Sequence, residues 1–400
     1  MKTHKKVSGK RLTLYIILFV LAGLIVFLFI PANYYVHRAL MFQSPKIDHY
    51  RIFENREVIA GDPQPWNFAA NYDTQDIPPR HQAYFEELGT VAFLVVKDGQ
   101  VIFEQYWDDH SEESYVNSFS MAKTVISLLV GCAIDDGFIK SVEQPVSDFL
   151  PEWTTFEGKA LTIKDLLTMS GGVKWDESYN SLFSLTTDAY YGNDLWKLTK
   201  NEVLEEQPGM RFNYQSGVSQ LLAFLLQKAV GKSVSEYASE KLWTPIGAEQ
   251  DALWSLDRKD GMEKAYCCFN SNARDFARLG QLVLNKGAWG TQQVVDTSYI
   301  NAMLTPATWL SYTPKPTPDG QPQLARPCTF YGYQIWLAQH EGMTIPYFRG
   351  ILGQYIFVIP EMNAVIVRLG HKRDKVYNID QNYTIDVDVW LDAGIEILRR

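Results

Sequence analysis

The sequence predicts a mixed α and β domain behind one N-terminal membrane helix. Three observations lead to this prediction: a charge-free apolar run over residues 12–30, two β-rich runs on either side of residues 97–100, and long proline-free apolar stretches that begin at Thr124 and Val218. The stretches are long enough for buried helices, whereas runs rich in β-branched and aromatic residues favour strands. Periodicity alone supports no finer description than mixed α and β.

The apolar run from Leu12 to Ile30 is long enough to cross a bilayer as a helix. Five Lys or Arg residues and no acidic residue precede it, so the positive-inside rule places residues 1–11 in the cytoplasm and everything after Pro31 on the far side. A cleaved signal peptide is the alternative, but the run exceeds a typical signal-peptide core and residues 29–33 form a poor cleavage site. We expect a single-pass inner-membrane protein with its catalytic domain on the extracytoplasmic, periplasmic side.

The chain after the anchor begins with a connector and a hairpin. Residues 31–76 are polar and aromatic with several turn residues, and we interpret them as a connector that packs on the domain. One large domain is expected over residues 77–400. Its first strands are Val91–Val96 and Val101–Tyr106, which flank a short turn and predict an antiparallel hairpin.

The later part of the domain alternates between helical and β-rich sequence. Over about residues 150–325 the sequence is mostly helical and loop in character, and the proline-rich stretch 306–327 is typical of a surface loop beside a cleft. Thr344–Arg349 and Gln354–Ile359 are two β-rich runs joined by Gly350–Gly353, a second hairpin by composition.

The most specific chemical signal is the pair Ser120 and Lys123, which forms the only S-x-x-K motif of the chain. One turn of helix places both side chains on the same face, and the apolar stretch that follows puts the motif at the start of a buried helix. A serine hydroxyl is a weak nucleophile and needs a base within hydrogen-bond reach. Lysine supplies that base when burial favours its neutral form.

Further motifs follow in a fixed order. Tyr214 lies in a Y-x-S sequence between a turn at Pro208 and the helical stretch Val218–Val230, and the second hairpin comes near the C-terminus. This combination resembles the serine hydrolase superfamily of class C β-lactamases, penicillin-binding proteins, related esterases and 6-aminohexanoate-dimer hydrolases, from about Thr90 to the C-terminus. The resemblance implies an α+β fold, an antiparallel sheet flanked by helices with a mostly helical inserted lobe. It implies Ser120 as the acylated nucleophile, Lys123 as its proton-transfer partner and Tyr214 as a general acid/base.

The third motif departs from that family. β-Lactamases and DD-peptidases carry Lys-Thr-Gly or His-x-Gly on a strand beside the site, and this chain has Arg349 and Gly350 preceded by phenylalanine. Arg349 restores a positive charge only if its side chain faces the pocket. The strand backbone at Gly350 and Ile351 can still present an N–H that forms an oxyanion hole with the N–H of Ser120.

Two more residues are candidate substrate contacts, with a packing or surface role as the alternative. Asn270 precedes a predicted helix where relatives place a residue of the site wall, and Tyr179 follows the double glycine at residues 171–172. How Lys123 and Tyr214 divide the base role stays open.

Composition excludes several other classes of protein. The net charge of −9 disfavours a nucleic-acid surface, and no His/Cys spacing suits zinc, so we expect no cofactor, no metal and no nucleic-acid partner. The four cysteines are expected as buried free thiols because neighbours such as Cys267 and Cys268 very rarely bridge; one long-range bridge of Cys328 is the alternative. The sequence thus predicts an esterase or amidase that acts on a small-molecule or peptide-like substrate. A catalytically silent ligand-binding or sensor protein and a true β-lactamase or DD-peptidase are the alternatives.

Overall fold

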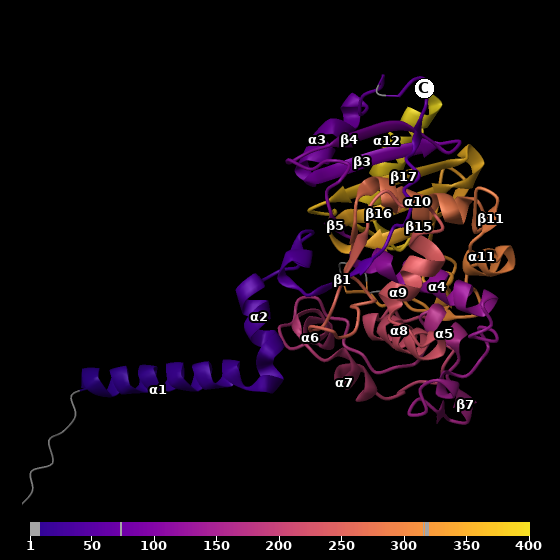
Figure 1. Cartoon of the computed structure of the whole chain (residues 1–400). Helices are drawn as coiled ribbons and strands as arrows, with labels where there is room; N and C mark the ends of the chain where they lie inside the picture. Colours follow the sequence, from indigo (N-terminus) through magenta and orange to yellow (C-terminus); the bar gives the residue numbers. More distant parts are fainter. Residues whose placement is uncertain (1–8, 73, 315, 317–319) are drawn as a thin grey trace, which may run out of the picture.

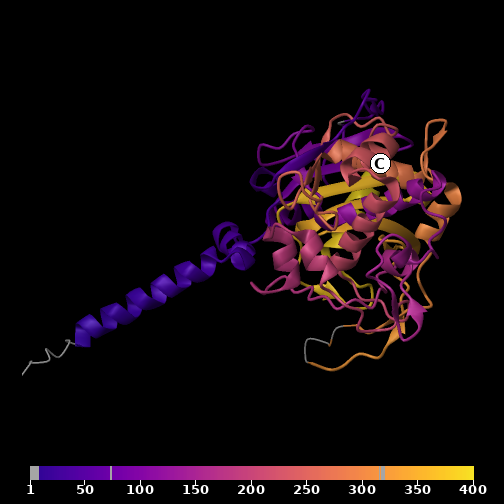
Figure 2. The same ribbon diagram turned by 60° about the horizontal axis from the view of Figure 1, so that its bottom comes forward.

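The computed structural model describes residues 9–72, 74–314, 316 and 320–400, so Lys2, Lys5 and Lys6 of the expected cytoplasmic tail lie outside the described residues. Helix α1 (Gly9–Phe29) extends away from the rest of the chain in both views (Figure 1, Figure 2). Its stretch Lys10–Leu28 has a mean hydropathy of 2.5 and is not buried against the domain. By length and composition, α1 is therefore a candidate membrane span or signal sequence.

A central sheet forms the upper part of the domain in Figure 1. Among the described residues it has seven strands, all antiparallel except for the edge pair of β2 and β4. Its strands, in spatial order, are β14 (Trp336–His340), β15 (Met343–Gly350), β16 (Gln354–Ile359), β17 (Ala364–Gly370), β3 (Thr90–Lys97), β4 (Gln100–Tyr106) and β2 (Asn67–Phe68).

Helices cover both faces of this sheet. Val365 and Ile366 are neighbours on β17 and therefore point to opposite faces. Helix α10 (Ala273–Leu284) lies on the Val365 face, where a Cβ added at Gly280 would stand 2.6 Å from Val365, and α12 (Asp386–Arg399) lies on the Ile366 face, where a Cβ at Gly394 would stand 2.3 Å from Ile366. Glycine at both positions allows each helix to approach the strand closely.

The lower part of Figure 1 is mostly helical. Its centre is the packing of α4 (Ala122–Asp135) against α8 (Ser216–Val230), both of which are almost wholly buried, as their apolar sequences require. The other α-helices are α2 (Tyr34–Phe42), α3 (Pro79–Glu87), α5 (Ile163–Leu167), α6 (Leu185–Tyr191), α7 (Leu195–Lys200), α9 (Val234–Ala238) and α11 (Thr297–Met303).

Short elements complete the domain. A second sheet, in the order β1-β8-β9-β5, contains β1 (Asn55–Val58), β8 (Ala252–Ser255), β9 (Phe269–Ser271) and β5 (Val116–Asn117). The two-stranded pairs are β6 (Thr155–Phe156) with β7 (Lys159–Ala160), β10 (Ala288–Trp289) with β11 (Gln292–Gln293), β12 (Ser311–Tyr312) with β13 (Arg326–Pro327), and β18 (Tyr377–Asn378) with β19 (Tyr383–Thr384). The 3₁₀-helical turns are η1 (Pro31–Asn33), η2 (His49–Ile52), η3 (Phe119–Met121), η4 (Val146–Asp148), η6 (Ile351–Gly353) and η7 (Pro360–Met362), and η5 (Ser239–Trp243) is a π-helical turn.

Both predicted hairpins are confirmed, as β3 with β4 and β15 with β16, and β17 brings the late strands back to β3. The expected connector, residues 31–76, contributes β1 to the second sheet and β2 to the edge of the first. Because β15 ends against η3, the late strands and the S-x-x-K helix meet at one place.

Candidate active site

Ser120 lies in the turn η3, directly before the buried helix α4. The residue before it, Phe119, has a left-handed backbone with φ of 45°, which is rare for an aromatic residue. Its N–H donates to Oδ1 of Asn117 at 2.8 Å, and this bond helps to hold the turn. Strained backbone of this kind is concentrated at functional sites, and here it directs the serine toward a cavity.

Lys123 is 1% exposed, and its Nζ makes three hydrogen bonds. It donates to Oγ of Ser120 at 3.1 Å, to Oγ of Ser216 at 3.3 Å and to the backbone oxygen of Tyr266 at 2.8 Å. None of these partners is a carboxylate. When the amine is neutral, its lone pair can accept the Ser120 proton over the same 3.1 Å, which is the geometry that a general base requires.

A carboxylate is hydrogen-bonded to Ser216, which itself accepts a hydrogen bond from Lys123. Glu177 accepts hydrogen bonds from the N–H and the Oγ of Ser216, both at 2.7 Å, and from the hydroxyl of Tyr179 at 2.5 Å. Burial, and then the charge of Glu177, raise the pKa of the Tyr266 phenol, so this group stays neutral. Sequence reasoning missed both Glu177 and Ser216. Ser216 is the third residue of the Y-x-S motif, but no local pattern marks Glu177.

Tyr214 lies over the lysine, with its ring centre 5.0 Å from Nζ of Lys123. Its ring also lies beside those of Trp336 on β14, with ring centres 5.3 Å apart, and Tyr331, at 6.2 Å. The structure brings Tyr214 to Lys123 as the motif predicts, although the contact shown is made by the ring.

The side chain of Arg349 does not line the cavity, as a side chain that binds a substrate carboxylate would have to do. Its guanidinium stacks on the ring of Trp336 at 4.0 Å and donates to the backbone oxygen of Asn382 at 2.8 Å. It is not among the described residues that line the cavity beside Ser120. The contacts that the structure gives this charge are therefore with Trp336 and Asn382.

Gly350 allows the end of β15 to touch the nucleophile turn. A Cβ at this position would stand 2.2 Å from the backbone oxygen of Ser118, so only glycine fits. The next residue, Ile351, lines the cavity together with Ser120. Their backbone N–H groups are thus the candidate oxyanion donors.

The cavity in front of Ser120 has a volume of about 400 Å³. Tyr179 lines it, as the sequence analysis expects, whereas Asn270 does not. Asn270 is fully buried in β9, where its Nδ2 donates to the backbone oxygens of Leu253 and Cys268 at 2.8 Å, so the structure places it in the packing role that was its alternative and not beside this cavity. The cavity is lined by Ala39, Gln43, Ser44, Pro45, Phe119, Ser120, Tyr179, Asn180, Ser181, Leu182, Thr186, Thr187, Tyr190, Tyr191, Ser216, Tyr266, Cys267 and Ile351.

The expectation of four free thiols is wrong. Cys267 and Cys268 form a disulfide between neighbouring residues, whereas Cys132 and Cys328 are free and buried. Cys268 has a left-handed backbone with φ of 66°, and the turn that results brings the two sulfurs together. The disulfide immediately follows Tyr266, whose backbone oxygen holds the lysine.

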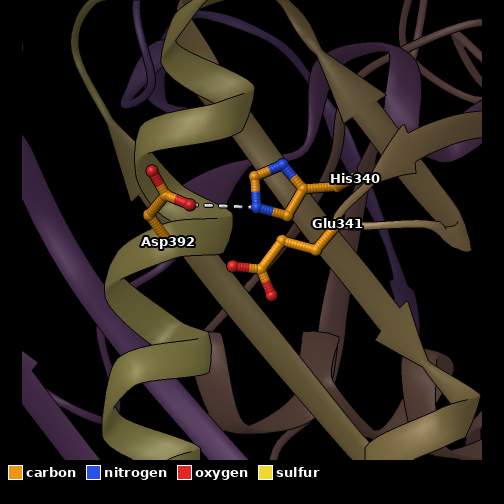
Figure 3. Close-up of side chains that lie close together, drawn as sticks. All are labelled: His340, Glu341 and Asp392. Carbon is orange, nitrogen blue, oxygen red and sulfur yellow. Dashed lines mark hydrogen bonds and ion pairs between the residues drawn. The ribbon is translucent and has the colours of Figure 1, made fainter.

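One other group of polar side chains lies far from Ser120 in the sequence (Figure 3). Both ring nitrogens of His340, at the end of β14, are hydrogen-bonded to carboxylates of α12. Nδ1 lies 3.1 Å from Asp388 and Nε2 lies 3.0 Å from Asp392. Glu341, beside it, pairs with Arg399 at 2.5 Å. Because these groups already have protein partners, we interpret the group as an ion-pair cluster that fastens α12 to the sheet.

The geometry around Ser120 is thus the one that a serine hydrolase requires: a serine hydroxyl at the wall of a cavity, with the amine of a buried lysine within hydrogen-bond reach. Comparisons with known proteins lead to the same class. The family model described as Beta-lactamase matches residues 81–387, and the chain belongs to this family. Its known relatives are hydrolases, and this chain is a serine hydrolase of the β-lactamase family.

Several relatives illustrate the range of this family. The 6-aminohexanoate-dimer hydrolase of Paenarthrobacter ureafaciens is 25% identical over 332 residues, which cover 79% of this chain and 82% of that protein. An Escherichia coli K12 protein with the provisional name D-alanyl-D-alanine carboxypeptidase is 23% identical, over 54% of this chain and 64% of that protein. The crystal structure of a family VIII carboxylesterase has a TM-score of 0.59 at 16% identity, over 81% of this chain and 99% of that one, and supports the fold alone.

Proposed function

We propose that this protein is a membrane-anchored, extracytoplasmic hydrolase that cleaves a neutral ester or amide through an acyl-enzyme on Ser120. Lys123 takes the proton from Oγ as it attacks the carbonyl carbon, and the N–H groups of Ser120 and Ile351 bind the developing oxyanion. Tyr214, beside the lysine, assists the proton transfer to the leaving group, and water then releases the acid. The observation that carries the proposal is the 3.1 Å contact between a fully buried lysine and the serine hydroxyl at the cavity wall.

An ester or amide is favoured over a β-lactam or a peptide with a free C-terminus. Arg349 is held by Trp336 and Asn382, so no cation among the described lining residues is placed to bind a substrate carboxylate. The carboxylate of Glu177, which accepts a hydrogen bond from the lining residue Ser216, opposes the binding of an anionic substrate. The name of the Paenarthrobacter relative is consistent with amide cleavage.

Hydrolysis of p-nitrophenyl butyrate tests the proposal. We expect Ser120→Ala to abolish it without a change in thermal stability, because the side chain faces the cavity. Ser181→Ala, at another hydroxyl of the cavity lining, is the matched control and should keep most of the activity. A folded Ser120→Ala variant with most of its turnover intact would contradict the assignment.

The location has its own test. The basic residues before the apolar run and the exposed surface of α1 support the anchor. Alkaline phosphatase fused after Asn33 should be active in a bacterial host, and the full chain should fractionate with membranes. A shortened soluble form would instead support a cleaved signal peptide.

A further inference from the structure

We propose that the Ser120 cavity takes uncharged amphiphilic esters directly from the bilayer that holds α1. This inference rests on the proposed function and names its substrate class. Three features of the molecule lead to it: the origin of one cavity wall, the absence of charge on the described lining, and the exposed apolar side chains that are next to lining residues in the sequence.

One wall of the cavity comes from the segment that follows the apolar helix. Ala39, Gln43, Ser44 and Pro45 all line the cavity. Ala39 comes nine positions after Ile30, and the residues between them are helical, so this segment spans only about 15 Å at 1.5–2.0 Å per residue. If α1 crosses a bilayer, the cavity lies within about that distance of the membrane surface.

This segment is fixed to the domain and is not a loose tether. Helix α2 lies against α6 (Figure 1), and the hydroxyl of Tyr191 donates to the backbone oxygen of Gln43 at 2.5 Å. His49 pairs with the hydroxyl of Tyr190 at 3.2 Å. Because Tyr190 and Tyr191 themselves line the cavity, the same contacts that hold α2 also fix the distance between cavity and membrane.

The described lining carries no charged side chain. Hydroxyls and amides alternate with the rings and alkyl groups of residues such as Phe119, Leu182 and Ile351. A buried carboxylate or ammonium without a partner is costly, so the acyl group that fits here is neutral. Its apolar part can contact the aromatic walls while the carbonyl reaches Ser120.

Exposed apolar side chains are adjacent in the sequence to residues that line the cavity. Leu40 and Met41, beside Ala39, are 54% and 59% exposed, and Phe183, beside Leu182, is 66% exposed. Exposed apolar groups of this kind favour insertion into the boundary of headgroups and acyl chains. A substrate dissolved in the bilayer would then enter the cavity without crossing bulk water.

The test compares a bilayer-held ester with a soluble one, using the full chain in phosphatidylcholine vesicles. We expect turnover of p-nitrophenyl palmitate carried in the same vesicles, and the double variant Leu40→Ser, Phe183→Ser should lower it about tenfold, because two side chains lose their apolar insertion. Turnover of soluble p-nitrophenyl acetate should stay unchanged in that variant, since neither residue lines the cavity.

The second part of the test compares a charged acyl group with an uncharged one. Mono(p-nitrophenyl) succinate has a carboxylate where the butyrate ester has a methyl group, and it should react at least about tenfold more slowly. Ser120-dependent turnover of the acetate ester with none of the vesicle-held palmitate, or with equal rates for succinate and butyrate, would overturn the inference and leave the hydrolase intact. Absence of any Ser120-dependent turnover would instead overturn the proposed function.

The disulfide beside the site supports a second, independent inference. We infer that the bridge between Cys267 and Cys268 positions the backbone oxygen of Tyr266 for Lys123. On one side of the bridge, the Cys267 N–H donates to the backbone oxygen of Lys264 at 3.1 Å; on the other, the N–H of Ser255 donates to the oxygen of Cys268 at 3.0 Å. These two hydrogen bonds fix the segment from Lys264 to Cys268 at both ends, and the Tyr266 oxygen lies within this segment.

Reduction by dithiothreitol tests this role. The dithiol transfers two electrons and two protons to the bridge, which gives two protein thiols and a cyclic disulfide. We expect kcat for p-nitrophenyl butyrate to fall about tenfold or more, with little change in KM, because the lysine loses a fixed acceptor while the cavity keeps its shape. Activity should return on reoxidation.

The double variant Cys267→Ser, Cys268→Ser is the control and should be slow and insensitive to the reductant. Intact mass reports complete reduction as a gain of two protons. Full activity of the completely reduced wild-type protein would refute the positioning role. A fall in Tm with no change in kcat would mean that the bridge only stabilises the fold.

Discussion

Glu177 gives the sharpest mutational test of the proton network behind Ser120. Its carboxylate accepts two hydrogen bonds from Ser216, both at 2.7 Å, and Ser216 in turn accepts one of the three bonds of Lys123. Glu177→Gln keeps the size of the side chain but removes its charge. The amide nitrogen of glutamine donates hydrogen bonds and cannot accept them. One of the two hydrogen bonds that Ser216 donates to this side chain is therefore lost or reversed in direction.

The size of the effect follows from these contacts. A hydrogen bond to a charged group contributes about 1.5–3 kcal/mol, so the loss of one such bond corresponds to about a 10- to 100-fold change in rate. We expect kcat for p-nitrophenyl butyrate to fall by that factor. KM should change by less than about threefold because a neutral ester makes no ion pair with Glu177.

The matched control is Glu152→Gln, the same substitution at an exposed glutamate. It should have wild-type kcat and KM. If folded Glu177→Gln kept kcat within about twofold of wild type, the carboxylate would have no part in positioning Ser216 and Lys123. A lower Tm with unchanged kcat would assign Glu177 to the fold alone.

Three further predictions concern the base, the ion-pair cluster and substrate charge. Lys123→Arg should lose several orders of magnitude in kcat, because arginine stays protonated and cannot accept the serine proton; near wild-type acylation would remove the lysine from the mechanism. Hydrogen bonding to Asp388, opposed by burial and reinforced by the charge of Asp392, raises the pKa of His340 above 6.5. The stability from this proton is present below about pH 6.5 and is lost as the pH rises through the raised pKa, so His340→Gln should lower Tm more at about pH 5.5 than at about pH 9, and equal losses would contradict this. Nitrocefin should be hydrolysed less efficiently than p-nitrophenyl butyrate, judged by kcat/KM; faster nitrocefin turnover that collapses in Arg349→Ala would show that this arginine binds the substrate carboxylate after all.

The sequence was informative wherever local pattern and chemistry coincide. The helix after Ser120 and both hairpins are continuous apolar or β-rich runs, and each forms where its run predicts it. Ser120 and Lys123 meet because the helix itself sets their spacing. These elements could be predicted because each depends on interactions between residues that are close in the sequence.

Contacts between distant segments could not be predicted in this way. Glu177 reaches Ser216 across 39 positions through an irregular loop, and nothing in the local sequence marks that approach. The direction of Arg349 depends on the register of β15 against its neighbours. Asn270 is next to the predicted helix but faces the interior of the second sheet.

The disulfide was missed for a related reason. Neighbouring cysteines are far from bridging geometry in regular helices and strands, so a free pair is the ordinary expectation. The left-handed backbone at Cys268 creates the exception. That conformation is held by the hydrogen bond between Ser255 and Cys268, which belongs to tertiary structure.

The central claim is that Ser120 carries the acyl group. Incubation of the full-length protein with a fluorophosphonate, followed by intact mass and peptide mapping, tests it most directly. The proposed mechanism predicts a single adduct on the peptide that contains Ser120, no adduct in Ser120→Ala, and much slower labelling in Lys123→Arg. An unlabelled wild-type protein, or an adduct on any other residue that persists in Ser120→Ala, would contradict it.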